Sequence, residues 1–346
     1  MSNLLEARNL TKIFGGGLFA KNRTVAVDDV SFHIKSGSPS ITAIAGESGS
    51  GKSTLAQLLL GIHKPTKGEV FYRGKDIAQV SGREKKQFRR EVQSIFQDPF
   101  EVYNPFYKVD HVLTTPISKF GLTKSKAEAT DIIEKGLSTV GLRPAETLGR
   151  YPHQLSGGQR QRLMIARALI LNPSIIVADE PVSMVDASLR ATILEDLRKV
   201  HRDYGISLIY ITHDLTTAYQ FCENIMILYQ GSVVEAGNVE KVIKNPEHPY
   251  TQLLVDSIPH PNPKKKWVTQ KKAIGKTSSE TIAQTTLVGC KFLDRCPKVM
   301  DICQSKHPST YLKDIDQTVS CYLHNDYKEI TSQDLAEIIS TGKGKK

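Results

Sequence analysis

Residues Gly46 to Thr54 read GESGSGKST, which matches the pattern G-x-x-x-x-G-K-[ST] of phosphate-binding loops. In such a loop the backbone N–H groups surround phosphate oxygens, and the side chain of Lys52 reaches the β- and γ-phosphates of a nucleotide. The positions expected to contact the nucleotide are Gly46, Ser48, Gly49, Gly51, Lys52, Ser53 and Thr54. Alone, this stretch predicts only that a nucleoside triphosphate binds.

The sequence on both sides of the loop predicts the order strand, loop, helix that the motif requires. The apolar run SITAIAG leads into the loop, and KSTLAQLLLGI continues from it with helical character. Residues 1 to about 40 alternate polar and apolar, which predicts short antiparallel strands joined by a glycine-rich turn at Gly15 to Gly17. Farther along, SIIVADEP and SLIYITHD read as buried parallel strands, each ending in acidic or polar residues.

An acidic pair follows the first of these two strands. Asp179 could hold Mg²⁺ directly or through water, and Ser53 could ligate the same ion through its hydroxyl. Glu180 is the candidate base that polarises the water attacking the γ-phosphate. An isolated acidic pair after a strand more often caps a turn. The apolar run before this pair and the phosphate loop upstream favour the catalytic interpretation.

Composition limits the classes of protein to consider. The 346 residues suit a core domain with an appendage, and the hydrophobic and charged fractions of 39% and 24% are ordinary for a globular protein. No apolar run approaches the ~18–20 residues that span a bilayer, and the start MSNLLEARNL lacks a signal pattern. We therefore expect a cytoplasmic protein. Residues 259–346 hold 15 Lys and Arg against 9 Asp and Glu, so +6 of the net charge of +10 lies in the last quarter.

The five cysteines divide into one isolated residue and a group of four. Cys222 lies in an apolar stretch and is expected in the core. The other four, Cys290, Cys296, Cys303 and Cys321, fall within the last 60 residues. In a reducing cytoplasm this clustering favours metal ligation over disulfides.

A second motif, LSGGQ at Leu155 to Gln159, makes the interpretation more specific. Together with the phosphate loop, in this order, it resembles the ATP-binding subunits of ABC transporters, and the likeness extends over residues 1 to 255. The resemblance implies that Gln97 in SIFQDP contacts Mg²⁺ and the attacking water, and that His213 in ITHD senses the γ-phosphate. It also implies that Phe14 in TKIFG stacks on adenine, with packing in the core as the alternative.

In this family the nucleotide lies between two ATP-binding subunits. Ser156, Gly157 and Gly158 match the segment that contacts the γ-phosphate of ATP bound to the opposite subunit. Asp186 in SMVDAS matches an aspartate that crosses the dimer interface. The family more often reads SALD there, so Met184 and Val185 depart from its pattern.

The end of the chain narrows the resemblance to the oligopeptide/dipeptide branch of ABC importers. HPYTQLL from His248, then GCKFLDRCPKVMDIC and VSCYL, match the C-terminal extension of that branch, whose relatives carry a four-iron four-sulfur cluster on this cysteine pattern. Zinc is the alternative, although the close C-x2-4-C pairs of structural zinc sites are missing, and unligated thiols are a third reading. The family often has a histidine where this chain has Gln317. A structural role for the cluster and a redox role both stay open.

The sequence thus predicts an α/β fold: a P-loop ATPase core over residues 1–258 with an antiparallel β subdomain and a helical subdomain at about 98–165. Residues 259–346 are expected to form a linker, to about 287, and a small Cys-rich extension. The resemblance implies an ATPase that uses ATP and Mg²⁺ at the cytoplasmic face of the membrane to power import of an oligopeptide, dipeptide or oligosaccharide. Its expected partners are a second, different ATPase chain, two transmembrane permeases and an extracytoplasmic solute-binding protein. The alternative is a soluble ATPase of the same type that acts on nucleic acid or ribosomes.

Overall fold

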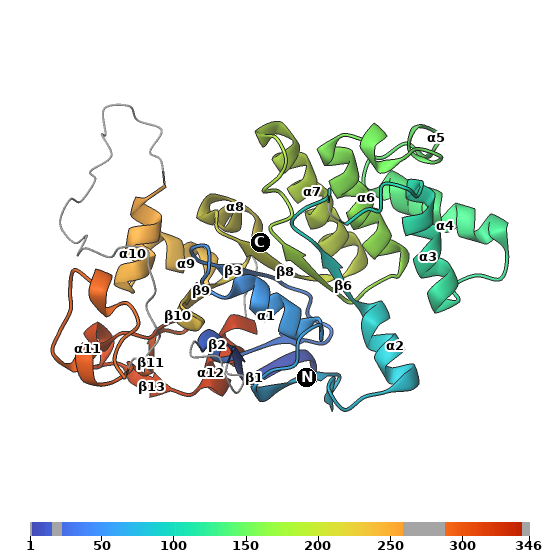
Figure 1. Cartoon of the computed structure of the whole chain (residues 1–346). Helices are drawn as coiled ribbons and strands as arrows, with labels where there is room; N and C mark the ends of the chain where they lie inside the picture. Colours follow the sequence, from blue (N-terminus) through green and yellow to red (C-terminus); the bar gives the residue numbers. More distant parts are fainter. Residues whose placement is uncertain (1, 16–22, 101, 259–287, 341–346) are drawn as a thin grey trace, which may run out of the picture. The chain divides into compact units, whose positions relative to one another are not determined.

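The computed structural model describes residues 2–15, 23–100, 102–258 and 288–340. These residues form two compact units, each built from more than one segment of the chain (Figure 1). The first unit takes its described residues from Met1–Ser36, Thr42–Ala78 and Thr212–Lys346, and the second from Gly37–Ile41 and Gln79–Ile211. The linker predicted at 259–287 lies outside the described residues, as does most of the predicted turn at Gly15 to Gly17.

The first unit begins with an antiparallel sheet of four strands in the order β2-β1-β4-β5. Its members are β1 (Asn3–Phe14), β2 (Thr24–Lys35), β4 (Lys67–Tyr72) and β5 (Lys75–Asp76). Every adjacent pair runs antiparallel. One face buries apolar side chains such as Leu5, Val30 and Phe32. The alternating pattern at the start of the sequence therefore predicted β1 and β2 correctly, whereas β4 and β5 lie beyond the residues it covered.

A second sheet of the same unit holds the strand that leads into the phosphate loop. The strand order is β13-β11-β12-β10-β9-β3. The bounds are β3 (Ile41–Ala45), β9 (Asn224–Tyr229), β10 (Ser232–Asn238), β11 (Thr310–Asp314), β12 (Gln317–Val319) and β13 (Lys328–Ile330). Strand β3 is parallel to β9, and the strands from β9 to β13 pair antiparallel. Because β3 and β9 are fully buried, their side chains are almost all apolar.

Short helices cover the sheets of the first unit. They are α1 (Lys52–Leu59), α8 (Leu215–Phe221), α9 (Val239–Lys244), α10 (Pro249–Asp256), α11 (Ile302–Ser305) and α12 (Ser332–Ser340), with the 3-10 turns η2 (Leu293–Arg295) and η3 (Tyr322–His324). Helix α12 packs against β2, where Glu337 pairs with Lys35 at 2.8 Å (Figure 1). The last described element therefore packs against one of the first strands of the chain.

The second unit combines three parallel strands with most of the longer helices. The strands are β6 (Val92–Ile95), β7 (Ile175–Asp179) and β8 (Ser207–Thr212), in the order β8-β7-β6. The helices are α2 (Gly82–Glu91), α3 (Val109–Phe120), α4 (Lys126–Thr139), α5 (Pro144–Thr147), α6 (Gly157–Ile170) and α7 (Ala187–Tyr204), with the 3-10 turn η1 (Pro152–Gln154). The two buried strands predicted after LSGGQ are confirmed as β7 and β8, which pair in parallel.

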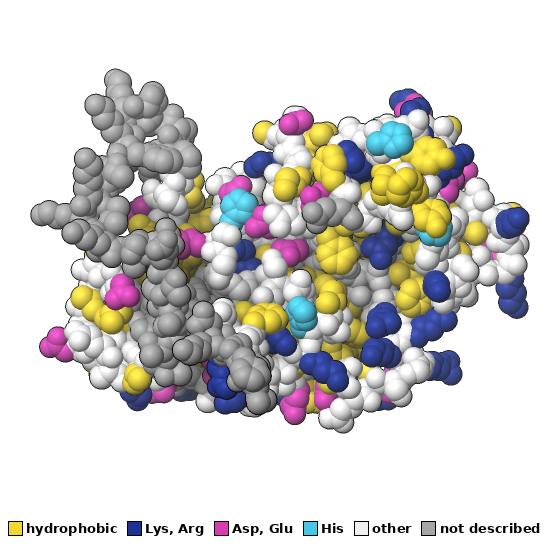
Figure 2. Space-filling view, in the orientation of Figure 1, with side chains coloured by type: hydrophobic (Ala, Val, Ile, Leu, Met, Phe, Trp, Pro, Cys, Tyr) yellow, Lys and Arg dark blue, Asp and Glu magenta, His cyan; other side chains and the backbone are white. Residues whose placement is uncertain are grey.

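The surface of the second unit is basic over one helix. Figure 2 shows Lys and Arg side chains gathered over α2, whose sequence is GREKKQFRRE. No helix in the part of the chain that the structure describes is long and apolar enough to cross a membrane.

Candidate functional site

The phosphate loop joins β3 to α1, and two of its glycines are required by close backbone neighbours. Gly46 has φ +150°, and a Cβ there would lie 2.3 Å from the carbonyl oxygen of Leu228 in β9. Gly51 has φ +103°, and a Cβ there would lie 2.1 Å from the carbonyl oxygen of Ala26 in β2. Both positions exclude any larger residue, because backbone atoms cannot move aside as side chains can. The strand, loop, helix context that the sequence predicted is confirmed.

The loop presents positive potential from a lysine and from a helix terminus. Lys52 is buried, and its Nζ donates to the carbonyl oxygens of Gly46 at 2.9 Å and Glu47 at 2.8 Å. Helix α1 begins at Lys52 without a side-chain cap and without an acidic residue in its first turn. Its first N–H groups thus point from a helix N-terminus, the arrangement that binds phosphate. Ser53 and Thr54 lie in this same first turn.

Two further residues predicted for the site also lie in the first unit. Phe14 ends β1 and is 37% exposed, so it is not a core residue. Its ring meets His63 edge-on at 5.6 Å between ring centroids, and the ammonium of Lys12 lies 5.1 Å from its centroid. His213 is exposed in the short segment between β8 and α8, next to Asp214, which caps α8.

In the second unit, Gln97 and Glu180 meet where two neighbouring strands end. Strands β6 and β7 are parallel, with Ile95 opposite Ala178. The residues that follow them therefore emerge at the same edge of the sheet. There the Gln97 amide donates to a carboxylate oxygen of Glu180 at 3.1 Å. Asp179, the last residue of β7, lies immediately before Glu180.

The backbone at Glu180 is held in an unusual conformation. Its φ of +44° lies in the left-handed region, which non-glycine residues rarely adopt. Three hydrogen bonds hold it: the Glu180 N–H donates to the Ile211 carbonyl at 2.9 Å, and its own carbonyl accepts from the N–H and hydroxyl of Ser183 at 3.2 and 3.0 Å. Strain of this kind costs roughly 1–3 kcal/mol and is typical of functional sites.

The LSGGQ segment forms the N-terminus of α6. Ser156 is the N-cap, and its hydroxyl accepts the Gln159 N–H at 3.2 Å while the Gln159 side chain accepts the Ser156 N–H at 2.9 Å. This is a capping box, and the S-x-x-Q spacing was the sequence signal for it. A Cβ at Gly158 would lie 2.7 Å from a Leu189 side-chain carbon, so this glycine lets α6 pack closely on α7.

Asp186 is exposed at the N-cap position of α7, close to the same segment. A Cβ at Gly157 would lie 3.8 Å from the Met184 carbonyl oxygen, so the SMVDAS turn and the LSGGQ segment are neighbours within the second unit. The two residues that depart from the family pattern have different environments, because Val185 is buried and Met184 is 51% exposed.

The four cysteines of the C-terminal extension (residues 288–340) converge on one small pocket. Its lining contains Cys290, Cys296, Cys303, Cys321, His248, Pro249, Phe292, Leu293, Lys298, Met300, Pro308 and Tyr322. None of these four cysteines forms a disulfide, and Cys222 is buried as predicted. Burial raises the pKa of Cys321 to about 11, and it also raises the pKa values of Cys290 and Cys296.

This convergence does not amount to a metal-ion site. Among the described residues, no group of three or more His, Cys, Asp or Glu side chains could hold a metal ion. The predicted iron–sulfur cluster is therefore not supported by the side-chain positions, and neither is the zinc alternative. Lining one pocket is not sufficient for ligation, because the ligands of one ion must also lie at the short bond distances of that ion.

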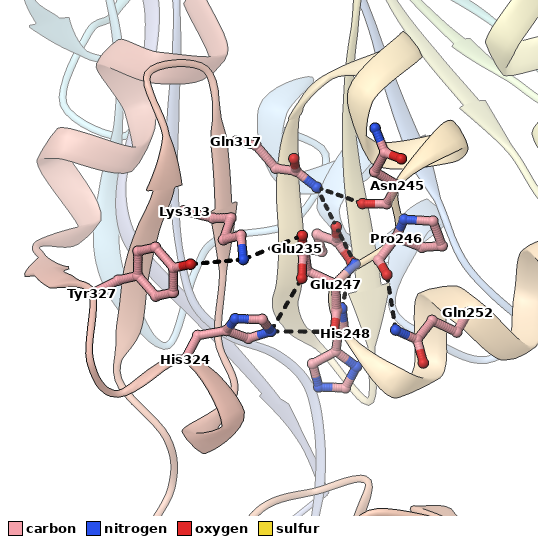
Figure 3. A network of polar contacts seen from close by, with 10 residues as sticks. All are labelled: Glu235, Asn245, Pro246, Glu247, His248, Gln252, Lys313, Gln317, His324 and Tyr327. Atoms are coloured by element: carbon pink, nitrogen blue, oxygen red, sulfur yellow. Dashed lines mark hydrogen bonds and ion pairs between the residues drawn. The ribbon is translucent and has the colours of Figure 1, made fainter.

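A polar network, drawn in Figure 3, joins the C-terminal extension to β10 and the segment before α10. Glu235 of β10 is 1% exposed, and its carboxylate accepts the N–H groups of Glu247 and His248 at 3.0 and 2.9 Å and the Gln317 amide at 2.9 Å. Gln317 also donates to the carbonyl of Asn245 at 3.0 Å. Gln317, which stands where the family often has a histidine, thus hydrogen-bonds a buried carboxylate. It is not among the residues lining the thiol pocket.

Two family models match this chain. The family model for ABC transporters matches residues 27–183, which contain the phosphate loop, Gln97, the LSGGQ segment and the acidic pair. The model for the C-terminal region of oligopeptide/dipeptide transporters matches residues 234–303, which contain Glu235 and three of the four clustered cysteines.

Individual proteins are similar along most of the chain. The dipeptide transport ATP-binding protein DppF of Haemophilus influenzae is 37% identical over 92% of this chain and 96% of its own length. A putative oligopeptide transport ATP-binding protein, YkfD of Bacillus subtilis, is 36% identical over 93% and 96%. The solved dimeric structure of the ATP-binding cassette MJ0796 bound to ADP and phosphate matches with a TM-score of 0.60 and 30% identity, over 68% of this chain and 98% of the other. With these relatives and these two family matches, the chain belongs to the family of ABC transporter ATP-binding proteins, in its oligopeptide/dipeptide branch.

Proposed function

We propose that this chain is the ATP-hydrolysing subunit that powers import of oligopeptides or dipeptides through a membrane ABC transporter. Its curated relatives are described as peptide transport proteins, which favours this function over action on nucleic acid or ribosomes. The single observation that carries the catalytic part is the hydrogen bond between Gln97 and Glu180 beside Asp179. An amide, a candidate base and a candidate magnesium ligand thus lie where two neighbouring strands end, and ATP hydrolysis needs groups of these kinds close together.

The proposed roles follow from the chemistry of each group. The Glu180 carboxylate takes a proton from the attacking water, whose oxygen bonds to the γ-phosphorus as the bond to the bridging β–γ oxygen breaks. Gln97 orients that water. Lys52 and the N–H groups of the phosphate loop balance the phosphate charge, His213 senses the γ-phosphate and Phe14 stacks on adenine. Mg²⁺ would be held by Ser53, Asp179 and Gln97, and it would neutralise the developing charge.

Hydrolysis is proposed to need a second ATP-binding subunit. Ser156, Gly157, Gly158 and Asp186 would then contact nucleotide bound to the opposite subunit, and we propose a heterodimer. In support, Ser156 and Asp186 are both exposed, and the segments that carry them are neighbours in one unit. The cassette MJ0796, a solved relative, is described as dimeric.

Membrane partners are proposed to bind the segment between β6 and α3. This segment exposes aromatic side chains, with Phe106 87%, Phe100 52% and Tyr107 52% exposed. Large exposed aromatics of this kind are typical of protein interfaces. Because the segment contains Gln97, its movement could transmit the state of the nucleotide. The subunit would therefore work at the cytoplasmic face of the membrane, bound to two permeases that receive peptide from a solute-binding protein.

We also propose that the four clustered thiols hold a polynuclear centre, a four-iron four-sulfur cluster, and not a single zinc ion. The Zn–S bond of about 2.3 Å brings tetrahedral thiolates to about 3.8 Å from one another, whereas a cluster spaces its ligands farther apart. What supports the proposal is that all four cysteines line one pocket. Iron and sulfide analysis of the full chain purified without oxygen tests this, with Cys303→Ser as the variant that should lose both.

The transport function is tested by isolating the tagged chain from gently solubilised membranes and identifying the proteins that accompany it. Two multispanning proteins and a second ATPase are expected, and ATP turnover of the isolated complex should rise when the companion binding protein is supplied with dipeptide or oligopeptide. Recovery of the chain with ribosomes or nucleic acid, and without permeases, would refute the importer and support the alternative.

A further inference from the structure

The segment between the first two clustered cysteines contacts the surroundings of the phosphate loop. This segment, Cys290 to Cys296, reads CKFLDRC, and we name it the brace loop. It carries two cations, Lys291 and Arg295, on either side of the buried aromatic Phe292. Arg295 contacts the phosphate loop directly, and Lys291 and Phe292 each contact a turn or side chain that is hydrogen-bonded to that loop. Well over two hundred residues of chain separate the two loops.

The first contact is an ion pair with the phosphate loop itself. The guanidinium of Arg295 binds the Glu47 carboxylate with two parallel hydrogen bonds, each 2.8 Å long. Bidentate pairs of this kind fix direction as well as distance. The Arg295 hydrogen bond lowers the pKa of Glu47, with a further contribution from the charge of Lys52. The positive charge of Lys52, which is proposed to reach the nucleotide phosphates, therefore also stabilises the charged form of Glu47.

The second contact is made by Lys291 with the turn between β9 and β10. Its Nζ donates to the Gln230 carbonyl at 2.9 Å and the Ser232 hydroxyl at 2.7 Å, and it pairs with Asp28 of β2 at 2.7 Å. Within that turn, the N–H of Gly231 donates to the carbonyl of Ser50 at 2.9 Å. Lys291 thus holds a turn that is itself hydrogen-bonded to the phosphate loop.

The third contact is aromatic. Phe292 is 1% exposed, and its ring centroid lies 5.2 Å from that of Tyr229 and 5.5 Å from that of Tyr250. The Tyr250 hydroxyl accepts the backbone N–H of Glu47 at 2.9 Å. Glu47 is therefore held at its main chain by Tyr250 and at its side chain by Arg295.

Glu47 places a negative charge in the loop that is proposed to bind the negatively charged phosphates. A carboxylate in a loop that binds phosphates repels those phosphates and attracts the lysine that should contact them. Arg295 neutralises this charge and turns the carboxylate toward itself. We propose that Arg295 is a positioning residue for the phosphate loop, so that the Cys-rich extension sets the affinity of the subunit for MgATP. The proposal rests on nucleotide binding at this loop, and it assigns to the extension a part in that binding.

The test compares MgATP affinity of the full-length chain with and without the ion pair. Arg295→Met should raise the Kd for MgATP roughly fivefold to tenfold, since an unpaired carboxylate is left in the loop. Glu47→Gln with Arg295→Met should restore the Kd to within about twofold of wild type, because no charge is left unpaired. Arg295→Lys, which keeps the charge but not the two parallel bonds, should lie between wild type and Arg295→Met.

A matched control separates positioning from simple attachment of the extension. Lys241 of α9 pairs with Asp314 and Asp316 of the extension, and neither of these partners belongs to the phosphate loop. Lys241→Met should therefore lower the melting temperature without changing the Kd for MgATP. In ATPase assays, Arg295→Met should raise KM more than it lowers kcat.

Three results decide between the explanations. An unchanged Kd in Arg295→Met, with wild type binding MgATP normally, would overturn the proposal while leaving the ATPase function intact. A double variant as weak as Arg295→Met would also overturn it, because the loss would then come from structure and not from the unpaired charge. Failure of the wild-type chain to bind MgATP at all would refute the ATPase function itself.

Discussion

The buried Glu235 provides a prediction whose size follows from the structure. Burial raises the pKa of its carboxyl group from 4.5 to about 7, and the N–H groups of Glu247 and His248 oppose the shift only in part. Between pH 4.5 and 7 the folded chain keeps this proton and the unfolded chain releases it. Folding stability from this group is therefore complete below pH 4.5 and is lost as the pH rises to about 7. The shift corresponds to about 3 kcal/mol.

A neighbouring group titrates in the opposite sense. Burial lowers the pKa of His248 from 6.5 to about 3, so its contribution to stability is present above pH 6.5 and is lost as the pH falls toward 3. Between pH 4.5 and 6.5 a rise in pH removes stability through Glu235 and adds stability through His248. The pH profile of wild-type stability therefore cannot separate the two contributions. The informative quantity is the difference in unfolding free energy between wild type and a variant at each pH.

The variant is Glu235→Gln, which has no charge at any pH. Relative to wild type, its unfolding free energy should rise by about 2 kcal/mol as the pH goes from 5 to 7, and the difference should become constant above about pH 8. Urea unfolding followed by circular dichroism measures this difference. His248→Gln is the companion variant, and its gain relative to wild type should appear on lowering the pH. A difference between Glu235→Gln and wild type that is the same at every pH would refute the reasoning.

Three further predictions concern the nucleotide site. Glu180→Gln should keep MgATP affinity but lower turnover by roughly a hundredfold to ten-thousandfold, measured as phosphate release; wild-type turnover would remove Glu180 as the base. Gly51→Ala should abolish MgATP binding, because its Cβ would lie 2.1 Å from a backbone oxygen, whereas Gly74→Ala, with similar positive φ and nothing within 4 Å, should only lower thermal stability slightly. Ser156→Ala should cost about 1 kcal/mol of unfolding free energy by removing the cap of α6, and no loss would contradict the capping role.

The local structure was largely predictable from the sequence. The phosphate loop, with an apolar run before it and a helical segment after it, fixes β3 and α1, because the motif has meaning only in that context. The buried runs after LSGGQ predict β7 and β8, since continuous apolar stretches of that length are typical of parallel strands. Parallel pairing of β6 with β7 then brings Gln97 to Glu180, although no spacing rule connects them.

The long-range contacts were not predictable. Nothing in the sequence indicates that Arg295 binds Glu47, because the pairing depends on how β9, α10 and the extension pack together. The burial of Glu235 is equally invisible, since VVEAGN gives an ordinary strand pattern with one acidic residue. The clustering of the cysteines predicted a shared ligand but could not give the separations of the thiols, and the side-chain positions of the described residues do not support the iron–sulfur cluster expected there.

The sequence separation of Glu47 and Arg295 has a consequence for how the protein folds while the ribosome synthesises it. The two residues are 248 positions apart, and at about 5–20 residues per second the ribosome needs roughly 12–50 s to make the chain between them. During that interval the emerging phosphate loop first lacks β9, then the turn at Gly231 and finally the brace loop. Nucleotide should therefore stabilise the nascent chain less than the finished chain until the brace loop has emerged, and a chain that stops before residue 290 should bind MgATP at least as weakly as Arg295→Met does.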